Sequence, residues 1–196
     1  MKKYILVLSL FILTISIYAQ NEIGSVTIQP KVGFNITDYA NDPDTDLKLG
    51  LVAGVEFEKK ATDRFGLAAG LVYSAQGSKV SSSGITTTIQ TDYINIPIIV
   101  NIFLSDEFAI KFGIQPGFNI NNSYEMKGSG VTVSGSMSDI GFDIQPFDFS
   151  VPIGLSFERN KFIVDARYNI GLTKIFNGYN DKNIVFQFTL GYKLDL

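Results

Sequence analysis

Apolar and polar residues alternate in the last stretch of the chain. Every second residue from position 184 onward is apolar or aromatic: Ile184, Phe186, Phe188, Leu190, Tyr192, Leu194 and Leu196. The residues between them are small or polar, apart from Val185. A period of two predicts a β-strand with one apolar and one polar face. A closing strand of this kind is typical of transmembrane β-barrels, in which Phe186, Phe188, Leu190, Tyr192 and Leu194 would face lipid.

The same alternation recurs along the chain and predicts eight strands. Their approximate limits are 26–36, 48–58, 64–77, 85–103, 108–118, 144–158, 162–173 and 184–196. Short connections (59–63, 104–107 and 159–161) alternate with long ones, of which 119–141 is the longest. Short turns at one rim and long loops at the other are the layout of an outer-membrane barrel with periplasmic turns. The sequence therefore predicts an all-β fold, an eight-stranded antiparallel up-and-down transmembrane β-barrel with both termini in the periplasm.

The first residues have the pattern of a cleavable secretory signal. Lys2 and Lys3 precede an apolar stretch, 4–18, that is short for a membrane span, and Ala19 offers a small residue before a cleavage site at Gln20. The predicted organisation is a signal peptide, 1–19, followed by one barrel domain, 20–196. Cleavage would remove two lysines and no acids, which changes the formal charge from −3 to −5. An acidic chain without a basic stripe argues against a nucleic-acid partner.

Composition excludes several kinds of chemistry. The chain has no cysteine and no histidine. Disulfides, thiolate catalysis, cysteine metal sites and a lipoprotein anchor are therefore absent, as are serine–histidine catalysis and imidazole ligands. We expect no enzyme activity, no cofactor and no catalytic or metal-binding residues.

Alternation alone does not say which face of the barrel points outward. A soluble lipocalin-like barrel, with its apolar face inward around a ligand, has the same period. Three features favour apolar side chains outside: a polar face rich in glycine and amides with few charges, apolar stretches of membrane-crossing length, and aromatic residues near the strand ends. These aromatics are Phe57, Phe65, Phe108, Phe157 and Phe162 at one rim and Tyr73, Phe118, Phe147 and Tyr168 toward the other. The expected location is the outer membrane, with its lipid as the first partner.

The inward phase of the strands then carries balanced charges. They are Lys31, Glu56, Lys111, Asp148, Asp165, Arg167 and Lys193, with Asp195 near the rim. Buried charges persist when they are paired, so we predict a salt-bridged plug, in which Lys193 pairs with Asp165 or Lys31 pairs with Glu56. Side chains fill the interior of an eight-stranded barrel, which argues against a wide pore; an ion or proton path is the functional alternative.

Five prolines complicate this pattern because proline cannot donate to a β-ladder. They are Pro30, Pro97, Pro116, Pro146 and Pro152, and all lie within the expected strands. We expect β-bulges at these positions, or strand limits that differ by a few residues.

Two loop regions carry candidate functions. Asp42, Asp44 and Asp46 have the opening spacing of a calcium loop, but Leu47 and Ala53 stand where glycine and glutamate are required. We therefore predict a solvated acidic loop there. The β-prone segments 86–88 and 131–134 extend their hairpins above the membrane, where they could also pair with a strand of a partner protein.

One string supports a family resemblance. Residues 92–100 read Asp-Tyr-Ile-Asn-Ile-Pro-Ile-Ile-Val, and with the glycine-rich second hairpin and Pro152-Ile153-Gly154 they resemble the PorT-like outer-membrane β-barrel family of Bacteroidota. The resemblance implies a small outer-membrane barrel without a catalytic residue set, and some members are linked to protein secretion. We expect a monomer with a structural, adhesive or accessory role through extracellular loops. The alternatives are a narrow channel, a secretion-system component with a protein partner, and a soluble ligand-binding barrel.

Overall fold

The computed structural model describes residues 23–40, 45–82 and 84–196. The expected signal peptide, 1–19, and the acidic positions Asp42 and Asp44 lie outside the described residues. Within the described part of the chain, no helix is long and apolar enough to cross a membrane.

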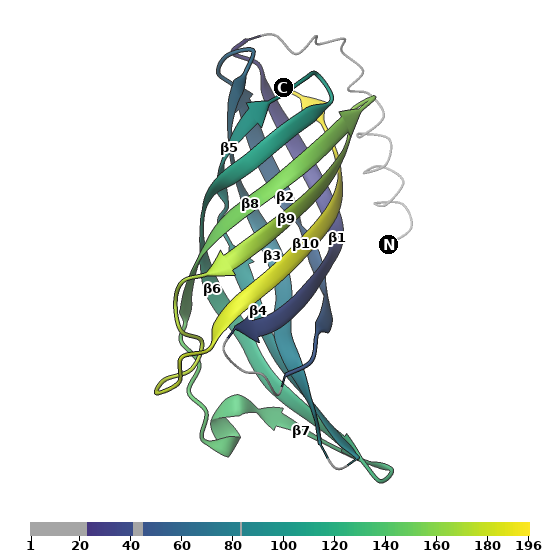
Figure 1. The fold of residues 1–196 in the computed structure, drawn as a ribbon, viewed down its shortest axis with the longest axis vertical. Helices are drawn as coiled ribbons and strands as arrows, with labels where there is room; N and C mark the ends of the chain where they lie inside the picture. The colour runs from purple at the N-terminus through teal and green to yellow at the C-terminus, as the bar shows by residue number, and fades with distance from the viewer. Residues whose placement is uncertain (1–22, 41–44, 83) are drawn as a thin grey trace, which may run out of the picture.

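The strands form one closed antiparallel ring (Figure 1). The ring has eight positions, each filled by one strand or by two strands in line, and we call each position a stave. In ring order the staves are β1 (Val26–Ala40), β2 (Lys48–Lys60), β3 (Phe65–Ser82), β4 (Ile85–Asn95) continued by β5 (Ile98–Phe103), β6 (Phe108–Gly128), β8 (Phe147–Arg159), β9 (Phe162–Gly171), and β10 (Lys182–Tyr192) continued by β11 (Leu194–Asp195). Pairing of β10 and β11 with β1 closes the ring. This ring confirms the predicted eight-stranded antiparallel barrel.

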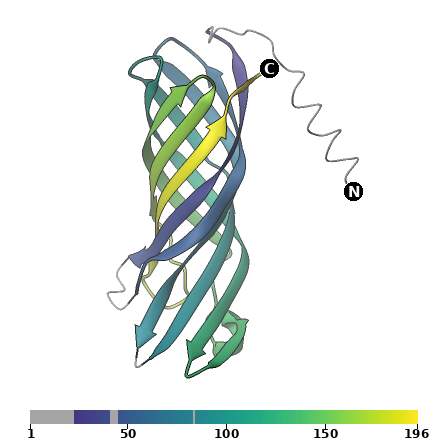
Figure 2. The same ribbon diagram turned by 90° about the vertical axis from the view of Figure 1, so that its right-hand side faces the viewer.

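The two ends of the barrel differ. The short connections and the C-terminus lie at one end, here called the turn end, and the longer connections lie at the other, the loop end (Figure 1). At the loop end, β3, β4 and β6 run beyond the other staves, and β6 is followed by β7 (Val131–Ser136), which pairs with it (Figure 2). We call these strand ends, 76–82, 85–91, 122–128 and 131–136, the projecting sheet.

The projecting sheet corrects the expected loop 119–141, and β1 corrects the expected end of the first strand at 36. Residues 119–128, expected to be loop, continue β6, and β7 and the short 3-10 helix η1 (Met137–Ile140) follow. The first strand also extends to Ala40. The physical reason is that threonines of β4 offer β-branched partners along this whole length, from Ile85 opposite Gly128 to Thr91 opposite Asn122.

The prolines do not cause bulges, and the alternative expectation, strand limits that differ by a few residues, is confirmed for two of them. Pro97 falls in the break between β4 and β5 and Pro146 precedes β8, so the expected strand limits were too wide there. The others keep the strand register: Pro30 opposite Val55, Pro116 opposite Phe149 and Pro152 opposite Asn169. The register shift lies instead between Asp92 and Tyr93, opposite β6. Each strand residue donates to only one neighbour, so a proline costs one ladder bond while its carbonyl still accepts, as Pro97 O does from Gly70 N.

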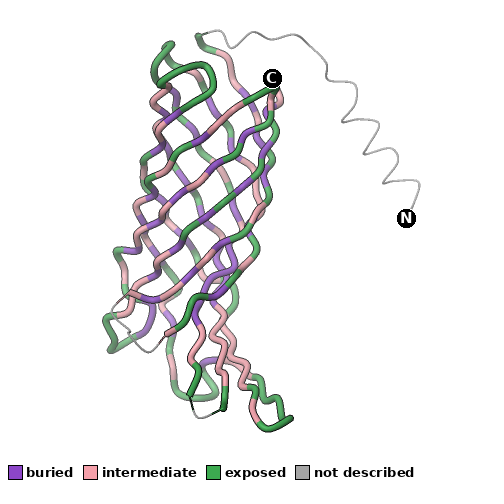
Figure 3. The backbone as a smooth tube through the Cα atoms, turned by 45° about the vertical axis from the view of Figure 1, so that its right-hand side comes forward, coloured by how far each residue is buried: buried purple, intermediate pink, exposed green. Residues whose placement is uncertain are grey.

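Buried and exposed residues alternate along the staves (Figure 3). Polar side chains fill the interior, and large apolar side chains are exposed on the outside. Aromatic pairs of neighbouring staves touch on this outer surface: Phe108 with Phe157, Phe162 with Tyr192, Phe118 with Phe147, Phe34 with Phe188, and Tyr168 with Phe186. The barrel is thus polar inside and apolar outside.

An apolar cluster covers the interior at the loop end. Its buried members are Tyr39, Met137, Ile144, Ile175 and Phe176, which come from β1, η1 and the connections on either side of β8 and β9. A bridge between Ile144 and Phe176 holds two of these connections together. We call this cluster the apolar lid.

Candidate functional site

Five charged side chains meet in the middle of the barrel interior. Lys31 lies on β1, Glu56 on β2, Lys111 on β6, and Asp165 and Arg167 on β9. Each is at most 5% exposed. These residues form what we call the central network, and they join four staves across the lumen.

Arg167 is the centre of this network. Its guanidinium binds the Glu56 carboxylate through two hydrogen bonds of 2.7 and 2.8 Å and the Asp165 carboxylate through two more of 2.8 and 2.9 Å. Lys31 Nζ lies 2.7 Å from Glu56 Oε2, and Lys111 Nζ lies 2.6 Å from Asp165 Oδ2. Paired bonds between a planar guanidinium and a carboxylate are the strongest ion-pair geometry in proteins. The network therefore fixes the relative positions of β2 and β9, whose partners are 111 residues apart.

Glycines make room for these long side chains. Gly70 pairs with Glu56, and Gly154 lies between Lys111 and Arg167. A Cβ atom at Gly70 would lie 2.6 Å from Glu56 Cγ, and one at Gly154 would lie 2.9 Å from Arg167 Cγ. Both distances are too short for carbon atoms, so the small residues on the inward phase are a packing requirement of the charged interior.

The network carries three cationic and two anionic side chains. Charges taken out of water are tolerated when ion pairs and hydrogen bonds compensate their lost hydration. Here both carboxylates receive bonds from more than one cation, so every charge has an opposite partner within 2.8 Å. The arrangement closes the middle of the lumen with side chains.

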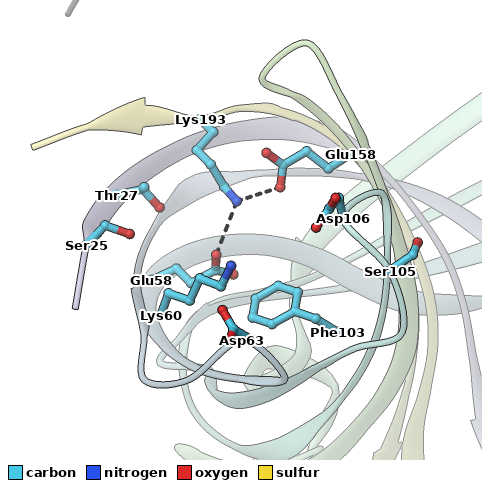
Figure 4. Close-up of a pocket in the computed structure, with 10 residues that line it drawn as sticks. All are labelled: Ser25, Thr27, Glu58, Lys60, Asp63, Phe103, Ser105, Asp106, Glu158 and Lys193. Atoms are coloured by element: carbon cyan, nitrogen blue, oxygen red, sulfur yellow. Dashed lines mark hydrogen bonds and ion pairs between the residues drawn. The ribbon is translucent and has the colours of Figure 1, made fainter. Parts of the chain in front are cut away.

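Lys193 is not part of this network, which corrects its expected pairing with Asp165. It binds Glu58 at 3.3 Å and also Glu158, at the turn end (Figure 4). Asp165 is occupied by Arg167 and Lys111 instead. The strand tilt explains the difference, because Lys193 follows the end of β10 at the rim whereas Asp165 lies further inside.

The rim site around Lys193 is narrow. Its hollow measures 30 Å³ and is lined by polar and charged residues, including Lys60, Asp63 and Asp106, with Phe103 beside them (Figure 4). Asn101 donates a further hydrogen bond to Glu58. This space is comparable to that of a single water molecule. The rim site is a second set of ion pairs and has no room for an organic ligand.

Asp148 and Asp195 also lie apart from the central network. Asp148 is buried near the loop end, where it accepts a hydrogen bond of 2.6 Å from Thr173 Oγ1. Asp195 binds Lys161 at the turn between β8 and β9, at 2.9 Å. The hydrogen bond to the Asp195 carboxylate raises the pKa of this partly exposed Lys161 above its usual value.

Sequence reasoning missed Glu58, Glu158 and the apolar lid. Both glutamates share the inward phase of their strands with buried neighbours, Glu56 and Ser156, so the period of two was a usable signal. Tyr39 lies beyond the expected limit of the first strand, and the other lid residues come from η1 and from connections without a regular period, so no pattern predicted them. Among the described residues no group of histidine, cysteine, aspartate or glutamate is arranged to hold a metal ion.

A comparison with protein-family models matches residues 18–177 to the outer membrane protein beta-barrel domain. The chain belongs to this family. It is therefore a small bacterial outer-membrane β-barrel with polar residues buried inside, and the soluble lipocalin-like alternative no longer applies. The search of curated proteins finds no match.

Solved structures share the fold at low sequence identity. Ail, the attachment invasion locus protein of Yersinia pestis, is 14% identical with a TM-score of 0.50, over 88% of this chain and 99% of that one. Ail in complex with the heparin analogue sucrose octasulfate is 12% identical with a TM-score of 0.52, over the same shares. Neisserial surface protein A is 11% identical with a TM-score of 0.49, over 85% of this chain and 96% of that one. At such identities the likeness concerns the fold alone.

Proposed function

We propose that this protein is a closed, monomeric outer-membrane barrel that binds an extracellular protein through its projecting sheet. The partner would add an extended segment to β7 by main-chain hydrogen bonds. The single observation that carries this proposal is the open, uncharged edge that β7 presents beyond the barrel rim.

The edge of β7 lacks the usual protection against pairing. In the described part of the chain β7 pairs only with β6, which leaves its other edge open. Its sequence, Val-Thr-Val-Ser-Gly-Ser, contains no charge and no proline, and Val131 and Val133 are 62% and 52% exposed. Exposed edge strands normally carry lysine, proline or bulges that prevent association. An edge without them is suited to strand addition.

The orientation of the barrel in the membrane follows from the difference between its turn end and its loop end. Outer-membrane barrels place short turns in the periplasm and long loops outside, so we infer that the loop end is extracellular and both termini are periplasmic. Ail is named as an attachment invasion locus protein, which supports an attachment role as one use of this fold. We retain the PorT-like resemblance as a hypothesis, together with its link to secretion; a secretion-system protein would then be the partner of the sheet. We propose no enzyme activity, no cofactor and no nucleic-acid partner.

The edge hypothesis predicts a loss of partner binding when a charge is placed on β7. Val133→Lys puts an ammonium group on the open edge, where a pairing strand would have to bury it. Cells that display the wild-type chain should adhere better than cells without it to plates coated with purified extracellular proteins. Cells that display Val133→Lys should adhere no better than cells without the chain. Ser129→Lys adds the same charge at the hairpin tip, away from the edge, and should keep the wild-type adherence. Equal adherence of the two variants would count against strand addition.

The rival function is that of a narrow channel. The packed lumen predicts that the barrel does not conduct ions. The central network and the apolar lid obstruct the interior at two levels. Purified protein in planar bilayers should therefore give no steady single-channel conductance, while an open porin reconstituted in parallel gives regular steps. Regular steps from this protein would favour the channel and show that the ion pairs open in a membrane.

A further inference from the structure

An open hollow of 440 Å³ lies on one face of the projecting sheet, over β4, β6 and β7. Most of the residues that line it carry a hydroxyl, amide or carboxylate group: Thr88, Gln90, Ser123, Glu125 and Ser134. Tyr124 and Gly135 complete the lining. The volume lies within the range of small-molecule sites. The hollow is therefore large enough for an organic ligand.

The strand register places the five polar side chains on the same face of the sheet. Thr88 lies opposite Glu125, and Glu125 lies opposite Ser134, so these three form a row across the sheet. Gln90 lies opposite Ser123 in the next row, two residues along each strand. Directly paired residues share a face, and so do residues two apart on one strand. Polar side chains in two adjacent rows therefore line the hollow.

A ligand over β4 and β6 can bond only to side chains. β4 is paired with β3 and β6, and β6 is paired with β4 and β7. The backbone N–H and C=O groups of both strands are thus used in ladders on either side. A peptide that binds by main-chain hydrogen bonds needs an open strand edge, and the middle of the sheet offers none. This face therefore suits a ligand that bonds to hydroxyl and amide groups.

The hydroxyl groups of this face are available to a ligand. Those of Thr88, Ser123 and Ser134 have no hydrogen-bond partner among the described residues. Gln90 is held in place, because its Nε2 donates to both carboxylate oxygens of Asp92 at 3.1 and 3.3 Å. Its amide oxygen remains to accept. Since each hydroxyl both donates and accepts, the two rows offer donors and acceptors side by side.

The single charge in the described lining is already compensated. Glu125 Oε1 lies 2.6 Å from the Nζ atom of Lys127, which is two residues along the same strand. Lys79 lies opposite Thr88 on β3 but is not one of the residues that line the hollow. A cationic ligand would have to compete with Lys127 for the carboxylate, and an anionic ligand would meet that carboxylate directly. An apolar ligand would cover the hydroxyl groups without bonding to them.

We propose that this hollow binds a short, uncharged saccharide. A sugar carries several hydroxyl groups around one ring, and the two rows of short polar side chains can donate to them and accept from them at once. The hollow also faces outward: Ser78 of β3 is buried and pairs with Ile89, and Thr88 and Gln90 flank Ile89 with the opposite phase. With the loop end extracellular, both a glycolipid headgroup of the outer leaflet and a free glycan can reach it.

An array of uncharged oligosaccharides, with their sulfated counterparts beside them, is the probe. The purified chain should be kept in a polyoxyethylene detergent, because glucoside and maltoside detergents carry the proposed ligand group. The wild type should bind at least one uncharged oligosaccharide saturably, and sulfation should not strengthen this binding. Failure to bind any uncharged oligosaccharide, or binding to the sulfated ones alone, would overturn the proposal.

Matched variants place the saccharide in the hollow. Thr88→Val combined with Ser123→Ala removes two hydroxyl groups from the lining and no charge. It should weaken binding of the same oligosaccharide about tenfold, as expected for the loss of two hydrogen bonds. Thr87→Val makes the same kind of change one residue away, on the other face, and should leave the affinity unchanged. Equal affinities of these two variants would show that the saccharide binds elsewhere. Heat-dependent gel mobility of each variant checks that the barrel is closed.

Two further measurements identify the source of the saccharide and separate this site from the β7 edge. In vesicles, lipopolysaccharide from the producing cells should compete with the oligosaccharide if the natural ligand is a lipid headgroup; lack of competition supports a free glycan instead. Val133→Lys alters the β7 edge, and its side chain has the opposite phase to Ser134, so it should bind the oligosaccharide as the wild type does. Saccharide binding can therefore fail or succeed independently of protein adhesion through β7.

Discussion

Replacing Glu56 with glutamine should lower the free energy of unfolding by about 3–5 kcal/mol, the cost typical of breaking a buried ion pair. Glu56 binds both Arg167 and Lys31. Without its charge, Arg167, Lys31 and Lys111 would share the single carboxylate of Asp165 in a space closed to water. Urea unfolding in detergent, followed by the heat-dependent gel shift and by tyrosine fluorescence, measures the change.

Two further variants separate the ion-pair effect from a general loss of charge. Glu107→Gln removes a carboxylate from an exposed turn and should change stability by less than about 0.5 kcal/mol. Lys31→Met in the Glu56→Gln background returns the network to an excess of one positive charge, so this double variant should be more stable than Glu56→Gln alone. If Glu56→Gln and Glu107→Gln unfold at the same urea concentration, the central network contributes nothing to stability.

Alternation predicted the staves because it is a local property of the chain. A period of two assigns each side chain to a face without reference to any other strand. This period predicted that five charged side chains point into the barrel, and all five are buried: Lys31, Glu56, Lys111, Asp165 and Arg167. Their partners could not be predicted in full, because height in the barrel depends on tilt and stagger between strands. Lys31 and Glu56 lie on adjacent strands, and the sequence was sufficient for that pair.

The pairing of Lys193 illustrates the limit. Lys193 and Asp165 share the inward phase, but they lie at different heights, and Lys193 meets Glu58 and Glu158 at the rim. The loop end was harder still to predict. The projecting sheet forms because β4 and β6 continue together, a cooperative property of two segments. Most residues of the apolar lid come from η1 and from connections that have no period at all.

The lipid-facing side chains of the last strand remain a prediction that one substitution tests. Phe186, Phe188, Leu190 and Tyr192 are exposed on the outer surface, and Leu194 is half-buried. Leu190 is 52% exposed and lies between Val32 and Val164 of the adjacent staves. If this surface meets the hydrocarbon, Leu190→Arg places a guanidinium in lipid, which costs about 2–4 kcal/mol at the midplane and less toward the interfaces.

The matched control is Leu104→Arg, at an exposed turn outside the staves. It makes the same chemical change in water, so it should fold into phospholipid vesicles as the wild type does. Thr189→Arg probes the opposite face: it would crowd the buried interior and should prevent a closed barrel in detergent as well as in lipid. Folding of Leu190→Arg should instead be impaired mainly in vesicles, and more strongly as the acyl chains of the lipid become longer. A thicker hydrocarbon layer holds the charge further from water. Folding of Leu190→Arg that matches Leu104→Arg at every chain length would mean that this part of β10 does not face lipid, and the outward assignment of the last strand would be wrong.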